Sequence, residues 1–264
     1  MNRIDACFSS LDERGEKGFI AYIAAGDPTL ARTVDLALAL ERAGTDLLEL
    51  GVPFSDPLAD GIVNQLAAQR ALEAGATVAG VLDCVRQIRK TSEMPIVLYT
   101  YLNPIVQFGF DRFYAEAESA GVDGLLMLDL PPDEDIEERS GALAHIRLVA
   151  PTTPASRIER ICARGAGFIY YVSREGVTGA QTQVATSLGK RVAELRKFTE
   201  LPIAVGFGIS TPEHVAEVAQ HADAVVVGSL IVNRIAEHGR APDLPERIEA
   251  FVAPLARATK SGRV

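Results

Sequence analysis

Residues 46–60 read DLLELGVPFSDPLAD. The stretch begins as a short apolar run and breaks at Gly51 and Pro53. Of its acidic residues, Glu49 interrupts the apolar run and Asp60 ends the loop. A strand in an all-parallel sheet is normally apolar on both faces, so Glu49 interrupts a strand that is otherwise suited to burial. A buried charge is costly unless it is paired or neutralised. Glu49 is therefore either one half of a structural ion pair or a working acid/base.

The loop that follows this strand is stiff and polar. Pro53 and Pro57 each fix a backbone angle and restrict the residue before them. A loop of this kind at the carboxyl end of a strand is where α/β barrels place their catalytic groups. Asp60, at the end of the loop, is either such a group or the N-cap of the next helix, and the two interpretations are compatible.

The rest of the chain alternates strands with helices. The apolar runs predict eight strands, at 19–24, 47–50, 95–101, 125–130, 147–150, 167–172, 203–205 and 224–227. We expect one domain over residues 1–264, a single (β/α)8 TIM barrel. An amphipathic helix at 2–13 would plug its floor, and a short extra helix would follow strand eight. A doubly wound sheet is the alternative, but no G-x-G-x-x-G motif opens a first βα unit.

Three local predictions complete this outline. The pair Asn103-Pro104 predicts a turn after strand three. An acidic helix is expected to begin at 133, because early carboxylates suit a helix N-terminus. The polar, glycine-rich stretch 174–187 is expected to be a long functional or mobile loop.

Composition excludes several classes of function. The 264 residues carry a net charge of −9, which gives no basic surface for nucleic acid. The three cysteines are far apart and form no C-x-x-C pair, so neither a disulfide framework nor a zinc site is indicated, and a reducing cytoplasm is expected. The N-terminus lacks the apolar core of a signal peptide, and no uncharged apolar run reaches membrane-spanning length.

Two glycine-containing loops predict an anion site. Gly206-Phe207-Gly208 follows strand seven, and Gly228-Ser229 follows strand eight. Barrel enzymes often bind phosphate where these two loops meet a short helix, since glycine lets the backbone approach the anion. Glycines also simply make turns, so the pair of loops carries more weight than either alone. Gly179, in the long loop after strand six, could close over the same anion.

Other candidate groups are few. Tyr170 and Tyr171 are adjacent on strand six and point to opposite faces, so one phenol is expected to face the barrel, although a packed tyrosine is the simpler interpretation. The four histidines fall on or beside predicted helices and are interpreted as solvated: His145, His214, His221 and His238. No metal ligand set and no G-x-S-x-G nucleophile elbow is present.

The run LELGVPFSDPLADG at 48–61 resembles the signature of the tryptophan synthase alpha chain family. Similar segments extend over nearly the whole chain: FIAY at 19–22, GDP at 26–28, APTTP at 150–154, YYVSREGVTG at 170–179 and GS at 228–229. The resemblance implies retro-aldol cleavage of indole-3-glycerol phosphate to indole and glyceraldehyde 3-phosphate. It implies no cofactor in this chain, with pyridoxal phosphate only in a partner beta chain, and a heterotetramer of two alpha and two beta chains.

The resemblance also implies roles for particular residues. Glu49 corresponds to the main acid/base residue, Asp60 to the carboxylate that holds the indole nitrogen, and Tyr170 to the secondary catalytic tyrosine. Phosphate-binding positions fall on Gly179, Phe207, Gly208, Gly228 and Ser229. Asp129 matches a position that contacts the strand-six loop near Thr178, although a turn or cap carboxylate is nearly as good an interpretation.

Three departures from the family pattern stand out. Tyr22 replaces the usual Phe of the indole pocket, Tyr99 stands near another apolar pocket position, and Ile62 follows Asp60-Gly61 where the family usually has Pro. The last change puts the partner contact in question more than the chemistry. The alternatives are a stand-alone indole-glycerol-phosphate lyase, a non-catalytic subunit that activates a beta chain, and another phosphosugar barrel enzyme.

Overall fold

The strands of this chain are short, parallel and nearly fully buried. The computed structural model describes residues 2–131, 142–172, 181–206 and 208–260, and for 181–187 it gives the backbone alone. The strands within these ranges are β1 (Gly18–Ala24), β2 (Leu47–Gly51), β3 (Ile96–Thr100), β4 (Gly124–Met127), β5 (Ala144–His145), β6 (Arg147–Val149), β7 (Ile169–Val172), β8 (Ile203–Gly206) and β9 (Ala224–Val227). Their order around the sheet is β5-β4-β3-β2-β1-β9-β8-β7-β6.

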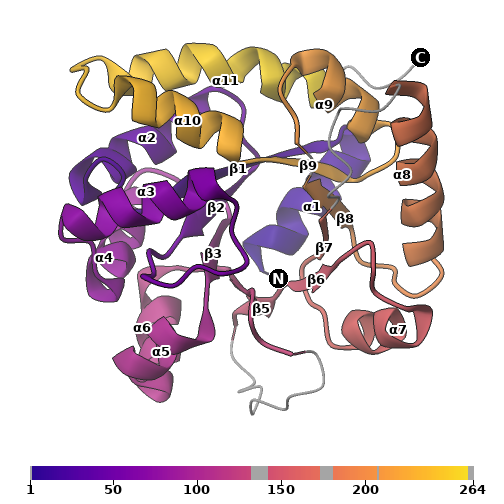
Figure 1. Cartoon of the computed structure of the whole chain (residues 1–264), viewed down its shortest axis with the longest axis horizontal. Helices are drawn as coiled ribbons and strands as arrows, with labels where there is room; N and C mark the ends of the chain where they lie inside the picture. Colours follow the sequence, from indigo (N-terminus) through magenta and orange to yellow (C-terminus); the bar gives the residue numbers. More distant parts are fainter. Residues whose placement is uncertain (1, 132–141, 173–180, 207, 261–264) are drawn as a thin grey trace.

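Helices surround this nearly closed barrel (Figure 1). Those of the first half are α1 (Arg3–Arg14), α2 (Leu30–Arg42), α3 (Ile62–Glu73), α4 (Val78–Ile88), α5 (Leu102–Phe108) and α6 (Phe110–Ala120). Those of the second half are α7 (Ala155–Ala163), α8 (Gln181–Leu195), α9 (Pro212–Ala219), α10 (Ser229–His238) and α11 (Leu244–Lys260). The predicted (β/α)8 barrel, with an added N-terminal helix and a short helix after the last strand, is confirmed.

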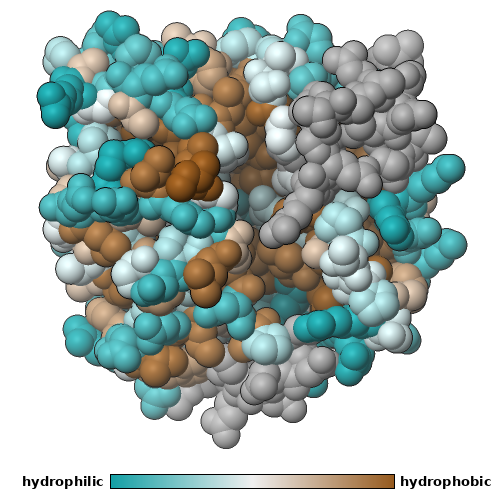
Figure 2. All heavy atoms as spheres, in the orientation of Figure 1, coloured by the Kyte–Doolittle hydropathy of each residue, from teal (hydrophilic) through white to brown (hydrophobic). Residues whose placement is uncertain are grey.

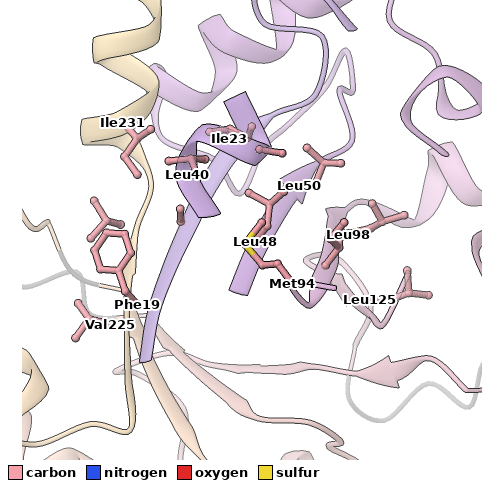
Figure 3. Close-up of a cluster of buried hydrophobic side chains, with 14 of the residues drawn as sticks. Phe19, Ile23, Leu40, Leu48, Leu50, Met94, Leu98, Leu125, Val225 and Ile231 are labelled. Atoms are coloured by element: carbon pink, nitrogen blue, oxygen red, sulfur yellow. The ribbon is translucent and has the colours of Figure 1, made fainter. Parts of the chain in front are cut away.

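Alternation along the strands sorts the core into two layers. Residues such as Phe19, Leu48 and Val225 point outward and pack against the surrounding helices (Figure 3). Residues between them point inward, and this is why the strands are apolar on both faces. Threonine N-caps begin three of the outer helices: Thr29 before α2, Thr77 before α4 and Thr211 before α9 each accept a backbone N–H.

The inward layer is closed at its amino-terminal end by α1. Ile4, Phe8 and Leu11 of α1 form one cluster with inward residues at the beginnings of the strands, among them Ile20 and Leu47. The plug predicted from the spacing of these three apolar residues is confirmed. With the floor filled, the carboxyl ends of the strands form the open end of the barrel.

The predicted fifth strand, 147–150, corresponds to β6, and the structure adds the two-residue strand β5 before it, on the other side of Ile146. β5 pairs with β4, β6 pairs with β7, and the Ile146 N–H donates to the carbonyl of Leu125 at 2.9 Å. Each of these two strands pairs with one neighbouring strand, so β5 and β6 together fill one strand position of the barrel. The apolar pattern gave no sign of a division because all the residues involved are nearly buried.

Two other local predictions are wrong. Asn103-Pro104 lies inside α5 instead of forming a turn, since a proline in the first turn of a helix has no N–H that the helix needs. The long polar loop is shorter than expected, because α8 already begins at Gln181. The predicted acidic helix from 133 lies outside the described residues. No helix in the described ranges is both long enough and apolar enough to cross a membrane.

Candidate active site

Glu49 lies in the middle of β2 and points into the barrel. All five residues of β2 are buried, and Glu49 itself is 0% exposed. Neither carboxyl oxygen has a hydrogen-bond partner among the described residues, and no ion pair to it is found there. Burial raises the pKa of this carboxyl from 4.5 to about 8. The structure therefore favours the acid/base interpretation of Glu49 over the ion-pair interpretation.

Asp60 lies at the open end of the barrel, called the mouth from here on, where the loop that follows β2 ends. Its Oδ1 accepts a hydrogen bond from the Tyr99 hydroxyl and its Oδ2 accepts one from the Tyr101 hydroxyl, both at 2.8 Å. The N-cap interpretation is wrong, because the cap of α3 is Gly61 and, in the described part of the chain, no side chain caps that helix. Two phenols, one within β3 and one just after it, thus hold this carboxylate. The sequence does not reveal these bonds, because the partners are 39 and 41 residues apart.

Three tyrosines lie near the two carboxylates. Tyr22 is the strand partner of Glu49, and its ring meets the Tyr99 ring edge-on at 4.9 Å between centroids. Tyr170 points inward and Tyr171 outward, as the alternation predicted. Burial, then nearby Glu49, raises the pKa of Tyr170, while burial and Asp60 raise those of Tyr22 and Tyr99. These phenols remain protonated donors at neutral pH.

The two glycine loops lie side by side at the mouth. β8 and β9 are paired, with Gly206 opposite Val226, so the loops that leave them are neighbours. Gly228 is the N-cap of α10, and no side chain of the described residues caps this helix, so its first N–H groups could face an anion. At Gly206 a Cβ would collide with the Tyr170 hydroxyl, whereas no atom of the described residues lies within 4 Å of one at Gly208.

Comparisons with known proteins agree with this geometry. The family described as tryptophan synthase alpha chain matches residues 8–260. The tryptophan synthase alpha chain of Opitutus terrae is 52% identical, over 97% of each chain, and that of Geobacter sp. strain M21 is 49% identical, over 99% of each. A crystal structure of the alpha subunit from Legionella pneumophila superposes with a TM-score of 0.90 at 40% identity, covering 98% of each chain.

The chain belongs to the tryptophan synthase alpha chain family. It is accordingly a carbon–carbon lyase of tryptophan biosynthesis, because the activity of this family is the cleavage of indole-3-glycerol phosphate. The family partners with a beta chain.

Exposed apolar residues gather beside the mouth on one side. Among the described residues, the large hydrophobic side chains that are exposed are Leu58, Ile62, Leu66, Leu72 and Val106. They come from the loop before α3, from α3 itself and from α5. Figure 2 shows the hollow of the mouth together with brown apolar atoms over α3. Exposed apolar patches of this kind often mark surfaces that bind other molecules.

Asp129 does not face the tyrosine cluster. It is exposed after β4, and its Oδ1 accepts the Leu102 N–H at the start of α5 at 2.8 Å. The cap interpretation therefore holds, and the predicted contact with the strand-six loop cannot be traced, because Thr178 lies outside the described residues. Gly179 and Phe207 lie outside them as well.

His145 corrects one prediction. It is buried in β5 and its Nε2 lies 3.3 Å from the Tyr114 hydroxyl, so it is not a solvated surface histidine. It points outward to α6, away from the mouth. The described part of the chain contains no cluster of His, Cys, Asp and Glu able to hold a metal ion.

Sequence reasoning missed Tyr101. Its hydroxyl donates to Asp60, accepts the Ala59 N–H at 3.1 Å, and its ring packs on Phe54 at 5.4 Å. A signal was present, since Tyr99 and Tyr101 are two apart at a strand end and share one face. What the pattern could not supply was the partner, because the loop reaches them only in the folded chain.

Proposed function

We propose that this chain cleaves indole-3-glycerol phosphate with Glu49 as the proton carrier and Asp60 as the group that meets the indole nitrogen. The observation that carries the proposal is the state of Glu49: fully buried, without a partner among the described residues, and with its pKa raised to about 8. A group that must both give and accept a proton works best when its pKa lies near the working pH.

Glu49 is mostly protonated at neutral pH and can therefore begin as the acid. Its proton goes to the indole ring carbon that bears the glycerol chain, and the positive charge spreads to the ring nitrogen. The carboxylate that remains then takes the proton of the adjacent glycerol hydroxyl. The carbon–carbon bond then breaks, and that oxygen becomes the aldehyde oxygen of glyceraldehyde 3-phosphate. The electron pair of the broken bond returns to the ring and restores indole.

Asp60 supplies the opposite charge where the positive charge develops. Two phenols hold its oxygens in place, so little reorganisation is needed during the reaction. Tyr170, which packs over Gly206 and lies near Glu49, would orient the substrate or relay a proton. Tyr22 and Tyr99 would line the indole ring. The step uses no cofactor in this proposal, and pyridoxal phosphate would belong to the beta chain.

The phosphate would sit on the two glycine loops. Gly208, Gly228 and Ser229 offer backbone N–H groups beside an uncapped helix end, and fixing the phosphate there would place the ring near Glu49. Thr178, Gly179 and Phe207 complete the proposed substrate contacts, with Asp129 supporting the strand-six loop.

For assembly we propose a heterotetramer of two alpha and two beta chains in the cytoplasm. Support comes from the family and from the exposed apolar residues on the loop before α3, α3 and α5. Ile62 is 66% exposed within this surface, so it is available to a partner.

The test is release of indole from indole-3-glycerol phosphate by the purified chain, with and without a beta chain. Glu49→Gln should lower the rate by about 10³-fold, since it removes the proton and keeps the shape. The matched control is Glu237→Gln, the same change on an exposed residue of α10. Equal loss in both variants, or release that survives in Glu49→Gln, would refute the assigned role.

The arms with and without the partner separate the alternatives. Slow release alone and strong activation by the beta chain support the proposed subunit. Fast release without it identifies a stand-alone lyase. No release in either arm, combined with activation of the beta chain, identifies a non-catalytic subunit.

A further inference from the structure

We propose that Tyr99 is a positioning residue for Asp60, fixing its carboxylate in the orientation that receives the indole N–H. This inference rests on the proposed function. Tyr99 occupies a pocket position at which the resemblance leads us to expect an apolar residue, and its hydroxyl is the feature that such a residue could not provide.

The loop that carries Asp60 is weakly anchored by itself. Ser55, Asp56, Leu58 and Ala59 are exposed, and Leu58 is 91% exposed. The Asp60 N–H bonds to Pro57 within the same loop. Among the described residues, the hydrogen bonds to the Asp60 carboxylate come from Tyr99 and Tyr101 alone. With one donor on each oxygen, the pair fixes the plane of the carboxylate as well as its place.

Tyr99 donates to Asp60 from within the sheet. It lies within β3, its strand partner is Gly51, and its ring packs edge-on against Tyr22. Among the described residues, the Tyr99 hydroxyl forms its hydrogen bond with the carboxylate only, whereas the Tyr101 hydroxyl also accepts the N–H of Ala59. Removing the Tyr99 hydroxyl therefore loosens the side chain of Asp60 without releasing the loop backbone.

Two neutral donors leave room for the substrate. Each carboxylate oxygen can accept two hydrogen bonds, so with the donors of the described residues one position on each remains for an N–H. A phenol positions the charge without neutralising it, and a prepositioned charge is what stabilises a developing positive centre. The effect should therefore be greater on turnover than on binding of the uncharged ring.

The experiment is a double-mutant cycle of Tyr99→Phe and Asp60→Ala. Turnover of indole-3-glycerol phosphate is measured beside calorimetric binding of an indole-3-alkyl phosphate that lacks the glycerol hydroxyls. We expect Tyr99→Phe to lower kcat about tenfold and to weaken analogue binding about threefold, a split that follows from charge appearing only during reaction. In the Asp60→Ala background, Tyr99→Phe should change neither quantity by more than about twofold.

Tyr114→Phe is the matched control. It removes another buried phenol with a hydrogen-bond partner, at α6 and away from the mouth, and should leave both quantities unchanged. Equal losses from Tyr99→Phe in both backgrounds would show a general packing role and overturn the inference. An unchanged kcat in Tyr99→Phe would overturn the inference too. A higher kcat would also overturn it, because it would show that Tyr99 competes with the substrate for Asp60.

Failure of the proposed function is a separate outcome. If the parent chain releases no indole, or if Asp60→Ala leaves the rate unchanged, the assigned reaction or the role of Asp60 is wrong. In the first case, the binding arm of the cycle still decides whether Tyr99 acts through Asp60. A Tyr99 effect on analogue binding that disappears in Asp60→Ala supports the inference, and one that persists refutes it.

Discussion

The two carboxylates of this site are held in opposite ways. Glu49 is part of β2, in which every residue is buried, and its carboxyl has no hydrogen-bond partner among the described residues. Asp60 ends an exposed loop, and both of its oxygens are bonded. A rigid backbone places the first, and side-chain hydrogen bonds place the second.

The difference matches what each group would have to do. A carboxyl that moves protons needs a raised pKa, and burial without donors provides it. A carboxylate that stabilises charge needs a fixed orientation, and hydrogen bonds provide that instead. One site thus contains two residues of similar chemistry in unlike environments, and each of the following experiments alters one side of this contrast.

The largest expected effect is the pH dependence of stability at Glu49. The pKa of Glu49 is higher in the folded chain than in the unfolded chain. Its contribution to the free energy of unfolding is therefore fully present below pH 4.5 and is lost as the pH rises through about 8. Between pH 5 and pH 8 the parent should lose roughly 3 kcal/mol of unfolding free energy relative to Glu49→Gln. Urea unfolding of both proteins across this range measures it, and parallel curves would mean that Glu49 ionises normally.

Removing the charge of Asp60 should have the next largest effect. Asp60→Asn keeps the size of the side chain and loses the charge opposite the indole nitrogen, so kcat should fall about 100-fold, or about 2.7 kcal/mol in barrier. Steady-state rates and urea unfolding together separate the cause. A fall in kcat with unfolding free energy kept within about 1 kcal/mol supports the electrostatic role, whereas matching losses point to a disturbed loop.

The smallest expected effect compares a strand glycine with a loop glycine. A Cβ at Gly51 in β2 would lie 2.5 Å from the Tyr22 hydroxyl, so Gly51→Ala should cost about 1–3 kcal/mol. No atom of the described residues lies within 4 Å of a Cβ at Gly61, and its φ of −71° suits alanine, so Gly61→Ala should cost less than about 1 kcal/mol. Equal costs in thermal unfolding would mean that the strand side of the site is less tightly packed than its geometry indicates.

The sequence indicated the strand side of the site far better than the loop side. Glu49 was visible because an acidic residue in an apolar strand breaks a local pattern, and Tyr170 followed from strand alternation. The bonds to Asp60 were not visible, because they join a loop to a strand that comes later in the chain. For the same reason the local pattern of Asp-Gly before a helix suggested an N-cap that does not form.

A similar limit explains the errors in the fold. The helix plug and the order of strands follow from periodicity, which depends on neighbours in sequence. The division between β5 and β6 depends on which strand lies on each side, and the burial of His145 depends on α6 lying over it. Asn103-Pro104 has the composition of a turn, but a helix accepts it in its first residues.

The helix α1 fills the floor of the barrel, so within the described residues the site opens at the carboxyl ends of the strands. If both products of cleavage leave by this open end, they share an exit with the incoming substrate. Indole, being apolar, would leave past the exposed leucine and isoleucine side chains beside the mouth, whereas the charged sugar phosphate needs water. Any chain seated on that apolar rim would stand in the path of one product and beside the path of the other, and so could influence the order in which they depart.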